Sequence, residues 1–272
     1  MWDKLKTRLI SAVVLVVILL VLVFFTPGWV FALLVCGLTF LVMYELTNVY
    51  NLSKKPSVVI VNYIFAAFIM FACHFVHPMF YFPSIVLYMM VLTAISVLDN
   101  KRVTFRDVCA SLFLVLYSVV LLLHLTYIRR MENGIALLFM AIIGAYVTDT
   151  GAYFTGMALG RHKLIPAVSP NKTVEGAVGG IVSCVVGFLI YGAVMSAMGY
   201  LVNYLWLVVL SIICGVVAQF GDLAASVMKR SFAVKDFGHL IPGHGGMVDR
   251  VDSLMFVAPV VYYFITFLPV IQ

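Results

Sequence analysis

The stretch L-I-S-A-V-V-L-V-V-I-L-L-V-L-V-F-F, residues 9–25, decides the fold class of this chain. It contains no charged residue, and its length suits a helix that crosses a bilayer, which takes about 20 apolar residues. Basic residues precede it, as in a signal peptide. However, the run is longer than the roughly 7–15 residues of a signal-peptide core, and no A-x-A-like cleavage site follows. We expect a retained first membrane span.

The composition extends this interpretation to the whole chain. Of the 272 residues, 64% are hydrophobic and 10% are charged, whereas soluble domains average about 45–50% and about 25%. This composition excludes a soluble globular domain, a disordered chain, a disulfide framework and a nucleic-acid-binding module. The apolar runs are continuous, unlike the alternating segments of about ten residues in a membrane β-barrel. The expected fold class is therefore all-α, as a polytopic integral membrane protein.

The distribution of positive charge predicts the topology. Lys and Arg accumulate on the cytoplasmic side of membrane proteins. With nine spans, every Lys and Arg except Arg129 and Arg130 falls on one side. This pattern places the N-terminus inside and the C-terminus outside. The expected spans cover residues 9–26, 29–49, 57–76, 79–98, 107–128, 134–157, 174–198, 203–228 and 251–271.

The two halves of the chain differ in character. Residues 1–130 carry few polar groups within their spans and are joined by short loops. Residues 131–272 hold most of the acidic residues and two long loops that the topology places in the cytoplasm. We therefore expect scaffold spans in 1–130 and catalytic spans in 131–272. Both belong to one continuous membrane domain, because no linker of soluble composition separates them.

Four acids lie within or at the ends of predicted spans: Asp149, Asp222, Asp249 and Asp252. A charge at the bilayer centre costs at least about 2.5–3.5 kcal/mol, so such a residue faces a cavity, a partner or a metal unless it reaches the interface. Asp249 and Asp252 are three residues apart, so their carboxylates point the same way. Paired carboxylates are typical of Mg²⁺ sites, which add substrate phosphates as ligands. Glu45 either lines the same cavity or extends to the interface.

Basic and glycine-rich segments accompany these acids. Asp222, Lys229 and Arg230 share one helical face. Glycines in the following loop allow a backbone to approach an anion closely, although such a run alone is equally typical of a flexible turn. Flanked by charges of both signs, the loop indicates a metal-and-phosphate site. The candidate phosphate contacts from this region are Lys229, Arg230, Lys235, His244, Gly245, Gly246 and Arg250.

The other long loop precedes the span predicted from residue 174. Ser169 and Thr173 can cap that helix, whereas Lys172 at its first turn opposes the helix dipole. A phosphate there would meet the dipole, free N–H groups and an ammonium together. Ser169 and Lys172 are therefore candidate phosphate contacts. Asp149 and Glu175 are candidate acids of the cavity.

Three segments together resemble a known family. Residues 149–156 (D-T-G-A-Y-F-T-G), 169–176 (S-P-N-K-T-V-E-G) and 226–252 (S-V-M-K-R-S-F-A-V-K-D-F-G-H-L-I-P-G-H-G-G-M-V-D-R-V-D) are similar to the phosphatidate cytidylyltransferases, also called CDP-diacylglycerol synthases, in the same order. In the first half the resemblance amounts to hydrophobicity, span count and the basic start. Asn171, where many relatives have a basic residue, is a departure that weakens its assignment as a phosphate contact.

The resemblance implies a reaction in phospholipid biosynthesis: CTP and phosphatidate give CDP-diacylglycerol and pyrophosphate. It implies Mg²⁺ as cofactor, and CTP, phosphatidate and membrane lipid as partners, at the cytoplasmic face of the inner membrane. A second, monovalent cation and a homodimer are open alternatives. The implied catalytic residues are Asp222, Lys229, Asp249 and Asp252, of which the three acids are the metal ligands.

Two other functions remain open at this stage. A secondary transporter for an anionic solute also uses intramembrane acids and Gly-interrupted helices. Against it, no internal repeat is visible, and the polar groups gather toward one membrane face. A related lipid-linked nucleotidyltransferase that acts on an ether lipid would share the same motifs.

Overall fold

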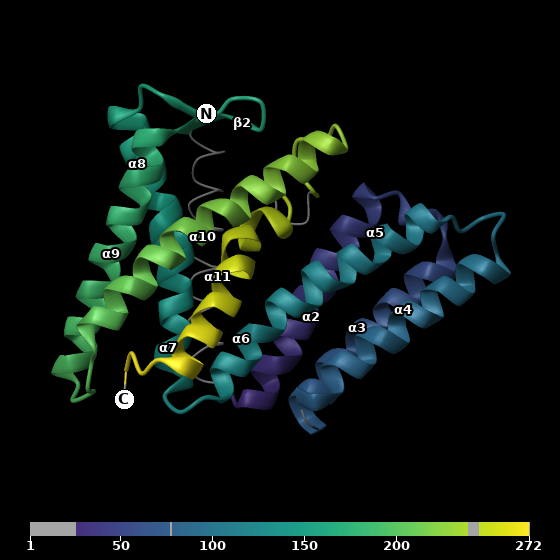
Figure 1. Cartoon of the computed structure of the whole chain (residues 1–272), viewed down its shortest axis with the longest axis horizontal. Coiled ribbons are helices and arrows are strands. Elements are labelled where there is room, and N and C mark those ends of the chain that lie inside the picture. The colour runs from purple at the N-terminus through teal and green to yellow at the C-terminus, as the bar shows by residue number, and fades with distance from the viewer. Residues whose placement is uncertain (1–25, 77, 239–244, 272) are drawn as a thin grey trace, which may run out of the picture. The chain divides into compact units, whose positions relative to one another are not determined.

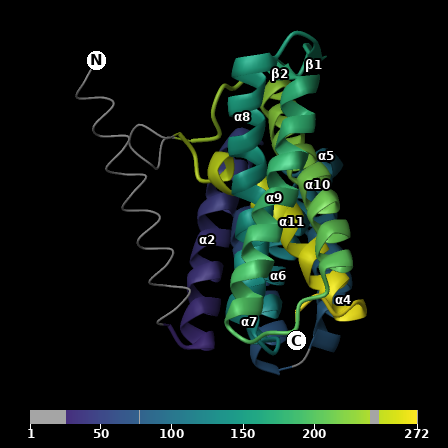
Figure 2. The same cartoon turned by 90° about the vertical axis from the view of Figure 1, so that its left-hand side faces the viewer.

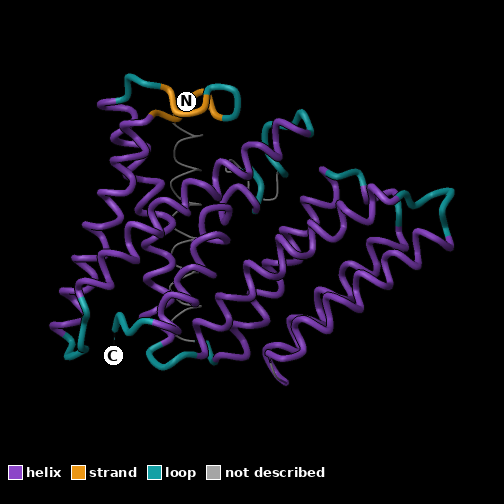
Figure 3. Tube along the Cα trace, viewed as in Figure 1, coloured by secondary structure: helices purple, strands orange, loops and turns teal. Residues whose placement is uncertain are grey.

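The computed structural model describes residues 26–76, 78–238 and 245–271 (Figure 1). Helices dominate this part of the chain (Figure 3). An apolar helix of 10–17 residues, Pro56–Phe71, accompanies seven that are long and apolar enough to cross a membrane. The seven are Gly28–Val49, Tyr81–Leu98, Phe105–Arg130, Gly134–Leu159, Val174–Ala197, Tyr204–Ser231 and Val248–Phe267.

The chain is thus an all-α integral membrane protein, as its composition predicted. The described helices lie on the spans expected from residue 29 onward. The first expected span, 9–26, falls almost entirely outside the described residues. The count of nine and the orientation therefore stay predictions.

Two of these seven spans contain a π-helical turn, and a third such turn, η2 (Ala72–Val76), follows α3 (Pro56–Phe71). Phe105–Arg130 consists of α5 (Phe105–Val115), η4 (Leu116–Val120) and α6 (Leu121–Arg130). Gly134–Leu159 consists of α7 (Gly134–Ile142), η5 (Ile143–Val147) and α8 (Thr148–Leu159). A π-helical turn shifts the register of the side chains that follow it and is frequent at functional sites. Here η5 immediately precedes the turn that carries Asp149.

The chain forms two compact units. The first comprises Met1–Thr126 and Asp236–Val248, and the second comprises Tyr127–Lys235 and Asp249–Gln272. The first unit contains in full two of the spans named above, α2 (Gly28–Val49) and α4 (Tyr81–Leu98). It also contains η1 (Leu52–Lys54), α3 (Pro56–Phe71), η2 (Ala72–Val76) and η3 (Pro78–Phe80). Helices α2 and α4 each pack against both α3 and α5.

Polar contacts join the helices of the first unit. The Tyr88 hydroxyl, which is fully buried on α4, donates to Asn62 Oδ1 at 2.8 Å and to the Ser111 carbonyl at 3.1 Å. Lys55, at the start of α3, forms an ion pair with Asp107 in the first turn of α5. These contacts tie α3, α4 and α5 together near their cores and at one end.

Close helix packing dominates the second unit, in which α8 and α10 (Tyr204–Ser231) both pack along α9 (Val174–Ala197) (Figures 1 and 2). A Cβ added to Gly176 would lie 2.8 Å from the Ala152 carbonyl oxygen, and one added to Gly180 would lie 3.0 Å from Ala152 Cβ. These distances leave no room for a side chain. The small residues of α8 and α9 thus allow the two helices to approach closely.

A short hairpin interrupts the helical architecture between α8 and α9. Strands β1 (Lys163–Ile165) and β2 (Ser169–Thr173) pair antiparallel, with Lys163 opposite Thr173 (Figure 3). The all-α expectation did not include it. Thr173 caps α9, as predicted, because its Oγ1 accepts from the Gly176 N–H at 3.1 Å. Ser169 lies in β2 and does not cap the helix.

Candidate active site

A glycine brings α10 against α11 (Val248–Phe267). A Cβ on Gly221 would lie 2.6 Å from the Asp252 carbonyl oxygen and 3.1 Å from Ser253 Cα, so no side chain fits there. This approach places Asp222, the next residue of α10, beside the first turns of α11. The Tyr146 hydroxyl of η5 donates to the Arg250 carbonyl at 3.1 Å, so η5 also contacts the first turn of α11.

Three carboxylates, from α8, α10 and α11, lie near enough at this junction to interact electrostatically. Asp252 interacts electrostatically with both Asp222 and Asp149, and Asp149 interacts with Asp222. Asp252 is 8% exposed, so water screens its charge poorly. Because like charges repel at short range, nearby cations or a bound proton stabilise the cluster.

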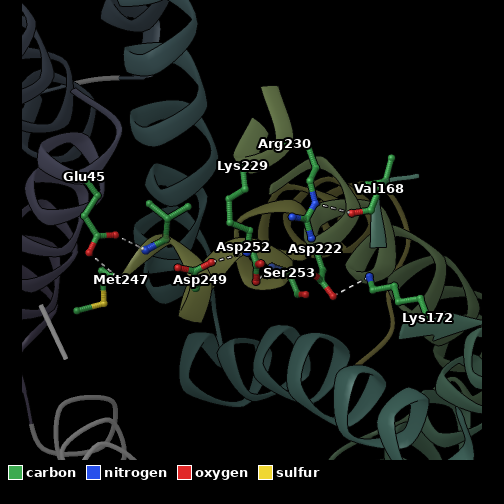
Figure 4. Close-up of polar contacts among 11 residues, drawn as sticks. Glu45, Val168, Lys172, Asp222, Lys229, Arg230, Met247, Asp249, Asp252 and Ser253 are labelled. Atoms are coloured by element: carbon green, nitrogen blue, oxygen red, sulfur yellow. Dashed lines mark hydrogen bonds and ion pairs between the residues drawn. The ribbon is translucent and has the colours of Figure 1, made fainter. Parts of the chain in front are cut away.

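Two lysines supply part of that positive charge (Figure 4). Lys229 Nζ lies 2.6 Å from Asp249 Oδ1, and the two side chains are only 17% and 7% exposed. Lys172 Nζ lies 2.6 Å from Asp222 Oδ2. Lys229 and Asp249 come from α10 and α11, whereas Lys172 reaches Asp222 from β2. The two acids expected to share a metal are thus each paired with a different lysine.

A third basic residue attaches the hairpin to α10. Arg230 Nε donates to the Val168 carbonyl at 3.2 Å (Figure 4). Together with the pair of Lys172 and Asp222, this bond holds the turn and strand β2 of the hairpin on α10. The candidate phosphate contacts Lys172, Lys229 and Arg230 are therefore gathered around the carboxylates.

Glu175 occupies a different position. Its carboxylate accepts the backbone N–H groups of Arg161, at 3.1 Å, and of His162, at 3.2 Å. His162 Nδ1 lies 2.6 Å from its Oε1. Glu175 therefore fastens the base of the hairpin to the start of α9, and these contacts do not bring it to the other acids.

The remaining candidates are spread along the chain. Lys235 is exposed beyond α10, and Arg250 is exposed in the first turn of α11. Gly245 adopts a left-handed φ of 82°, which its missing side chain permits. Gly245 and Gly246 belong to the first unit, and His244 lies outside the described residues.

The structure answers the question that the sequence left open for Glu45. The residue is 1% exposed, so its side chain is buried in the protein and does not extend into solvent. Its carboxylate accepts backbone N–H groups at the start of α11 (Figure 4). Pattern analysis could not find this contact because its partner Met247 is 202 residues away.

The donor set of the cluster fits Mg²⁺. Within residues 26–76, 78–238 and 245–271, no three His, Cys, Asp or Glu side chains are grouped closely enough to hold a metal ion by themselves. Mg²⁺ usually takes only one or two carboxylates and completes its octahedron with water and substrate phosphates. Asp222 and Asp252 of this cluster offer such carboxylates, Asp249 beside Lys229 offers another, and the adjacent bases suit a phosphate-bearing substrate.

Comparison with known proteins identifies the family. The model of the cytidylyltransferase family matches residues 6–268. The chain belongs to the cytidylyltransferase family. This confirms the resemblance detected in residues 149–252, and the matched range contains every acid and lysine of the cluster.

Individual relatives agree with this assignment. The chain is 38% identical over 175 residues to the phosphatidate cytidylyltransferase of Bacillus subtilis (strain 168), covering 64% of each chain. It is 39% identical over 176 residues to that of Staphylococcus saprophyticus, covering 65% of this chain and 66% of the relative. It is 38% identical over 180 residues to that of Staphylococcus haemolyticus, with the same two coverages. The matches thus span 64–66% of the length of these relatives.

Proposed function

We propose that this chain is a phosphatidate cytidylyltransferase, which converts CTP and phosphatidate to CDP-diacylglycerol and pyrophosphate. The observation that carries the proposal is the gathering of carboxylates and lysines from β2, α10 and α11 in a chain of this family. The names of the relatives add support.

The chemistry requires charge neutralisation more than a protein nucleophile. An oxygen of the phosphatidate phosphate forms a bond to the α-phosphorus of CTP. The bond from that phosphorus to the oxygen bridging to the β-phosphate breaks, and pyrophosphate leaves with the electron pair. Because the substrate supplies the nucleophile, no Ser, Cys or His is needed for that role. The protein positions two anions against each other and stabilises the charge of the transition state.

Different residues of the site can neutralise the phosphates and hold the metal ion. Lys172, Lys229 and Arg230 neutralise phosphate oxygens, and Arg250 is placed to contribute from the first turn of α11. Lys172 and Lys229 each form an ion pair with a carboxylate, which holds their ammonium groups in the proposed phosphate-binding region. Ser169, Lys235, His244, Gly245 and Gly246 remain proposed phosphate contacts.

The proposed metal site uses Asp222, Asp249 and Asp252. Bound Mg²⁺ would supply positive charge to the nucleotide phosphates. The carboxylates would position the metal ion. When no substrate is present, the ion pairs with Lys172 and Lys229 neutralise part of their negative charge. Asp149, on α8, contributes negative charge to the same cluster. A second, monovalent cation stays an open part of this proposal.

The proposal includes topology and location. The distribution of Lys and Arg supports nine spans in the cytoplasmic membrane, with the N-terminus inside and the C-terminus outside. The active site would then lie at the cytoplasmic face, where CTP is available, while the acyl chains of phosphatidate stay in lipid. Residues 1–130 would act as scaffold and residues 131–272 as the catalytic part.

An assay of the purified protein in detergent tests this function. With CTP, phosphatidate and Mg²⁺, we expect CDP-diacylglycerol and pyrophosphate in equal amounts, and EDTA should stop the reaction. Diacylglycerol in place of phosphatidate should give no product, because it lacks the nucleophilic phosphate. An ether-linked phosphatidate analogue that reacts faster than phosphatidate would favour the related ether-lipid enzyme. No turnover with any of these lipids would contradict the proposal.

A further inference from the structure

Glu45 is a buried carboxylate within a predominantly apolar membrane span. It lies on α2, where Val42, Met43 and Leu46 are fully buried. The span has a mean hydropathy of 2.0. An ionised carboxylate is retained in such surroundings only when hydrogen bonds or a cation compensate for its lost hydration. The contacts of Glu45 should therefore reveal its role.

Both carboxylate oxygens accept a backbone N–H at the start of α11. Glu45 Oε1 accepts from Met247 at 2.8 Å, and Oε2 accepts from Val248 at 2.9 Å (Figure 4). The first N–H groups of a helix have no partner within the helix. A Ser, Thr, Asp or Asn usually caps them from the N-cap position, but Met247 has no side-chain oxygen. Glu45 caps α11 from another helix instead.

The same carboxylate also lies against the other flank of the glycine-rich segment. A Cβ added to Gly238 would lie 2.5 Å from Glu45 Oε1, so a side chain there would displace the carboxylate. Gly238 precedes residues 239–244, and Met247 follows them. Glu45 thus contacts the chain on both flanks of this segment, within the first unit. The Met247 and Val248 N–H groups are consequently not available to a substrate phosphate.

We propose that Glu45 is a positioning residue for the metal-binding acids. Asp249 directly follows Val248, and Asp252 lies one turn further along the same continuous helix. A helix that loses its cap frays or shifts in its first turn, which would move both carboxylates. The kinetic part of this inference rests on the proposed function, in which Asp249 and Asp252 hold Mg²⁺.

Replacing Glu45 by glutamine removes the negative charge and keeps the size and shape of the side chain. Glu45→Gln keeps the size of the side chain, but its amide has one acceptor oxygen, so one of the two N–H groups would face an NH₂ donor. We expect hydrogen exchange in the peptide 245–252 to become at least about fivefold faster, as for a lost cap. The Mg²⁺ concentration for half-maximal turnover should rise about tenfold, as for a lost partner of a metal ligand. KM for CTP at saturating Mg²⁺ should change less than twofold.

Two further variants serve as controls. Thr47→Val alters another buried polar residue of α2, whose hydroxyl has no hydrogen-bond partner among the described residues. It should leave both hydrogen exchange and the Mg²⁺ titration unchanged. Glu45→Asp keeps the charge on a shorter side chain and should give intermediate values. If Glu45→Gln does not fold, the aspartate variant carries the test.

The outcomes of this experiment are distinct. Wild-type exchange of the Met247 and Val248 amides, together with a wild-type Mg²⁺ titration, would overturn the positioning role. Faster exchange with an unchanged titration would also overturn it and leave a capping contact alone. If the wild-type protein does not convert CTP and phosphatidate, the proposed function fails. The exchange comparison would still decide whether Glu45 caps α11.

Discussion

Lys172 of β2 and Asp222 of α10 form an ion pair, with 2.6 Å between Nζ and Oδ2. The sequence placed Lys172 in the first turn of the following helix and therefore predicted an anionic partner for it. That placement was wrong, because Lys172 lies in β2 and α9 begins only at Val174, but the lysine does have an anionic partner. In the structure that partner is a carboxylate of the proposed metal site. The hairpin between α8 and α9 is therefore connected to the residues proposed to bind Mg²⁺.

Removing the Lys172 ammonium should impair the use of CTP. We expect Lys172→Ala to lower kcat/KM for CTP at least about tenfold, since it removes a preorganised cation that would face a phosphate. The protein should still fold, because the pair is partly exposed, at 24% and 34% for the two side chains, and such pairs add little stability. Lys163→Ala, on the exposed strand β1, is the matched control. Equal kinetics for the two variants would remove Lys172 from the site.

The two acids proposed to share Mg²⁺ should behave as a unit. Asp222→Asn and Asp249→Asn should each lower turnover by about 100-fold or more. The double variant should be hardly worse than the worse single variant, because groups that act together are non-additive. Asp236→Asn, an exposed acid between them in sequence, should retain activity. Substantial turnover with a normal Mg²⁺ titration in either single variant would refute the shared site.

The close approach of α10 and α11 should tolerate no added methyl group. Gly221→Ala would place Cβ 2.6 Å from the Asp252 carbonyl oxygen. We expect a loss of about 1–3 kcal/mol in stability from overpacking, measured by thermal unfolding in detergent, and reduced turnover. Gly37→Ala is the control, because a Cβ there meets nothing within 4 Å. It should be neutral or slightly stabilising, since alanine favours a helix. Equal stability of both variants would contradict the packing described here.

The topology can be tested by accessibility in intact cells. In a cysteine-free background, Lys163→Cys should resist an impermeant thiol reagent added from outside. Glu132→Cys, in the turn between α6 and α7, should react with it. These results follow from the distribution of Lys and Arg. The reverse pattern would invert the orientation and move the site to the outer face.

The helices from residue 29 onward could be predicted because long uncharged runs have few alternatives in a membrane chain. The acids of the site were equally visible, because Asp149, Asp222, Asp249 and Asp252 interrupt apolar sequence. Thr173 was predictable as a cap from its position alone. Each of these signals is local, lying within one helix or at its end.

What escaped prediction depends on contacts between distant segments. The hydrogen bonds from the α11 backbone to Glu45 involve main-chain N–H groups, which carry no residue-specific signal. The hairpin was missed because β1 has only three residues, too few to show alternation. The π-helical turn η5 shifts the register of the side chains before Asp149, and no residue pattern in the sequence indicates it. The partners of Lys172 and Lys229 likewise emerged only from the packing of β2, α10 and α11.

The most direct test of the account is to follow the phosphorus atoms of CTP. The purified protein is incubated with phosphatidate, Mg²⁺ and CTP labelled at either the α- or the γ-phosphorus, and the lipid is extracted. We expect the α-label to enter the lipid and the γ-label to leave as pyrophosphate, because the bond between the α- and β-phosphates breaks. Absence of α-label from the lipid, or transfer of the γ-label to it, would contradict cytidylyl transfer by this chain.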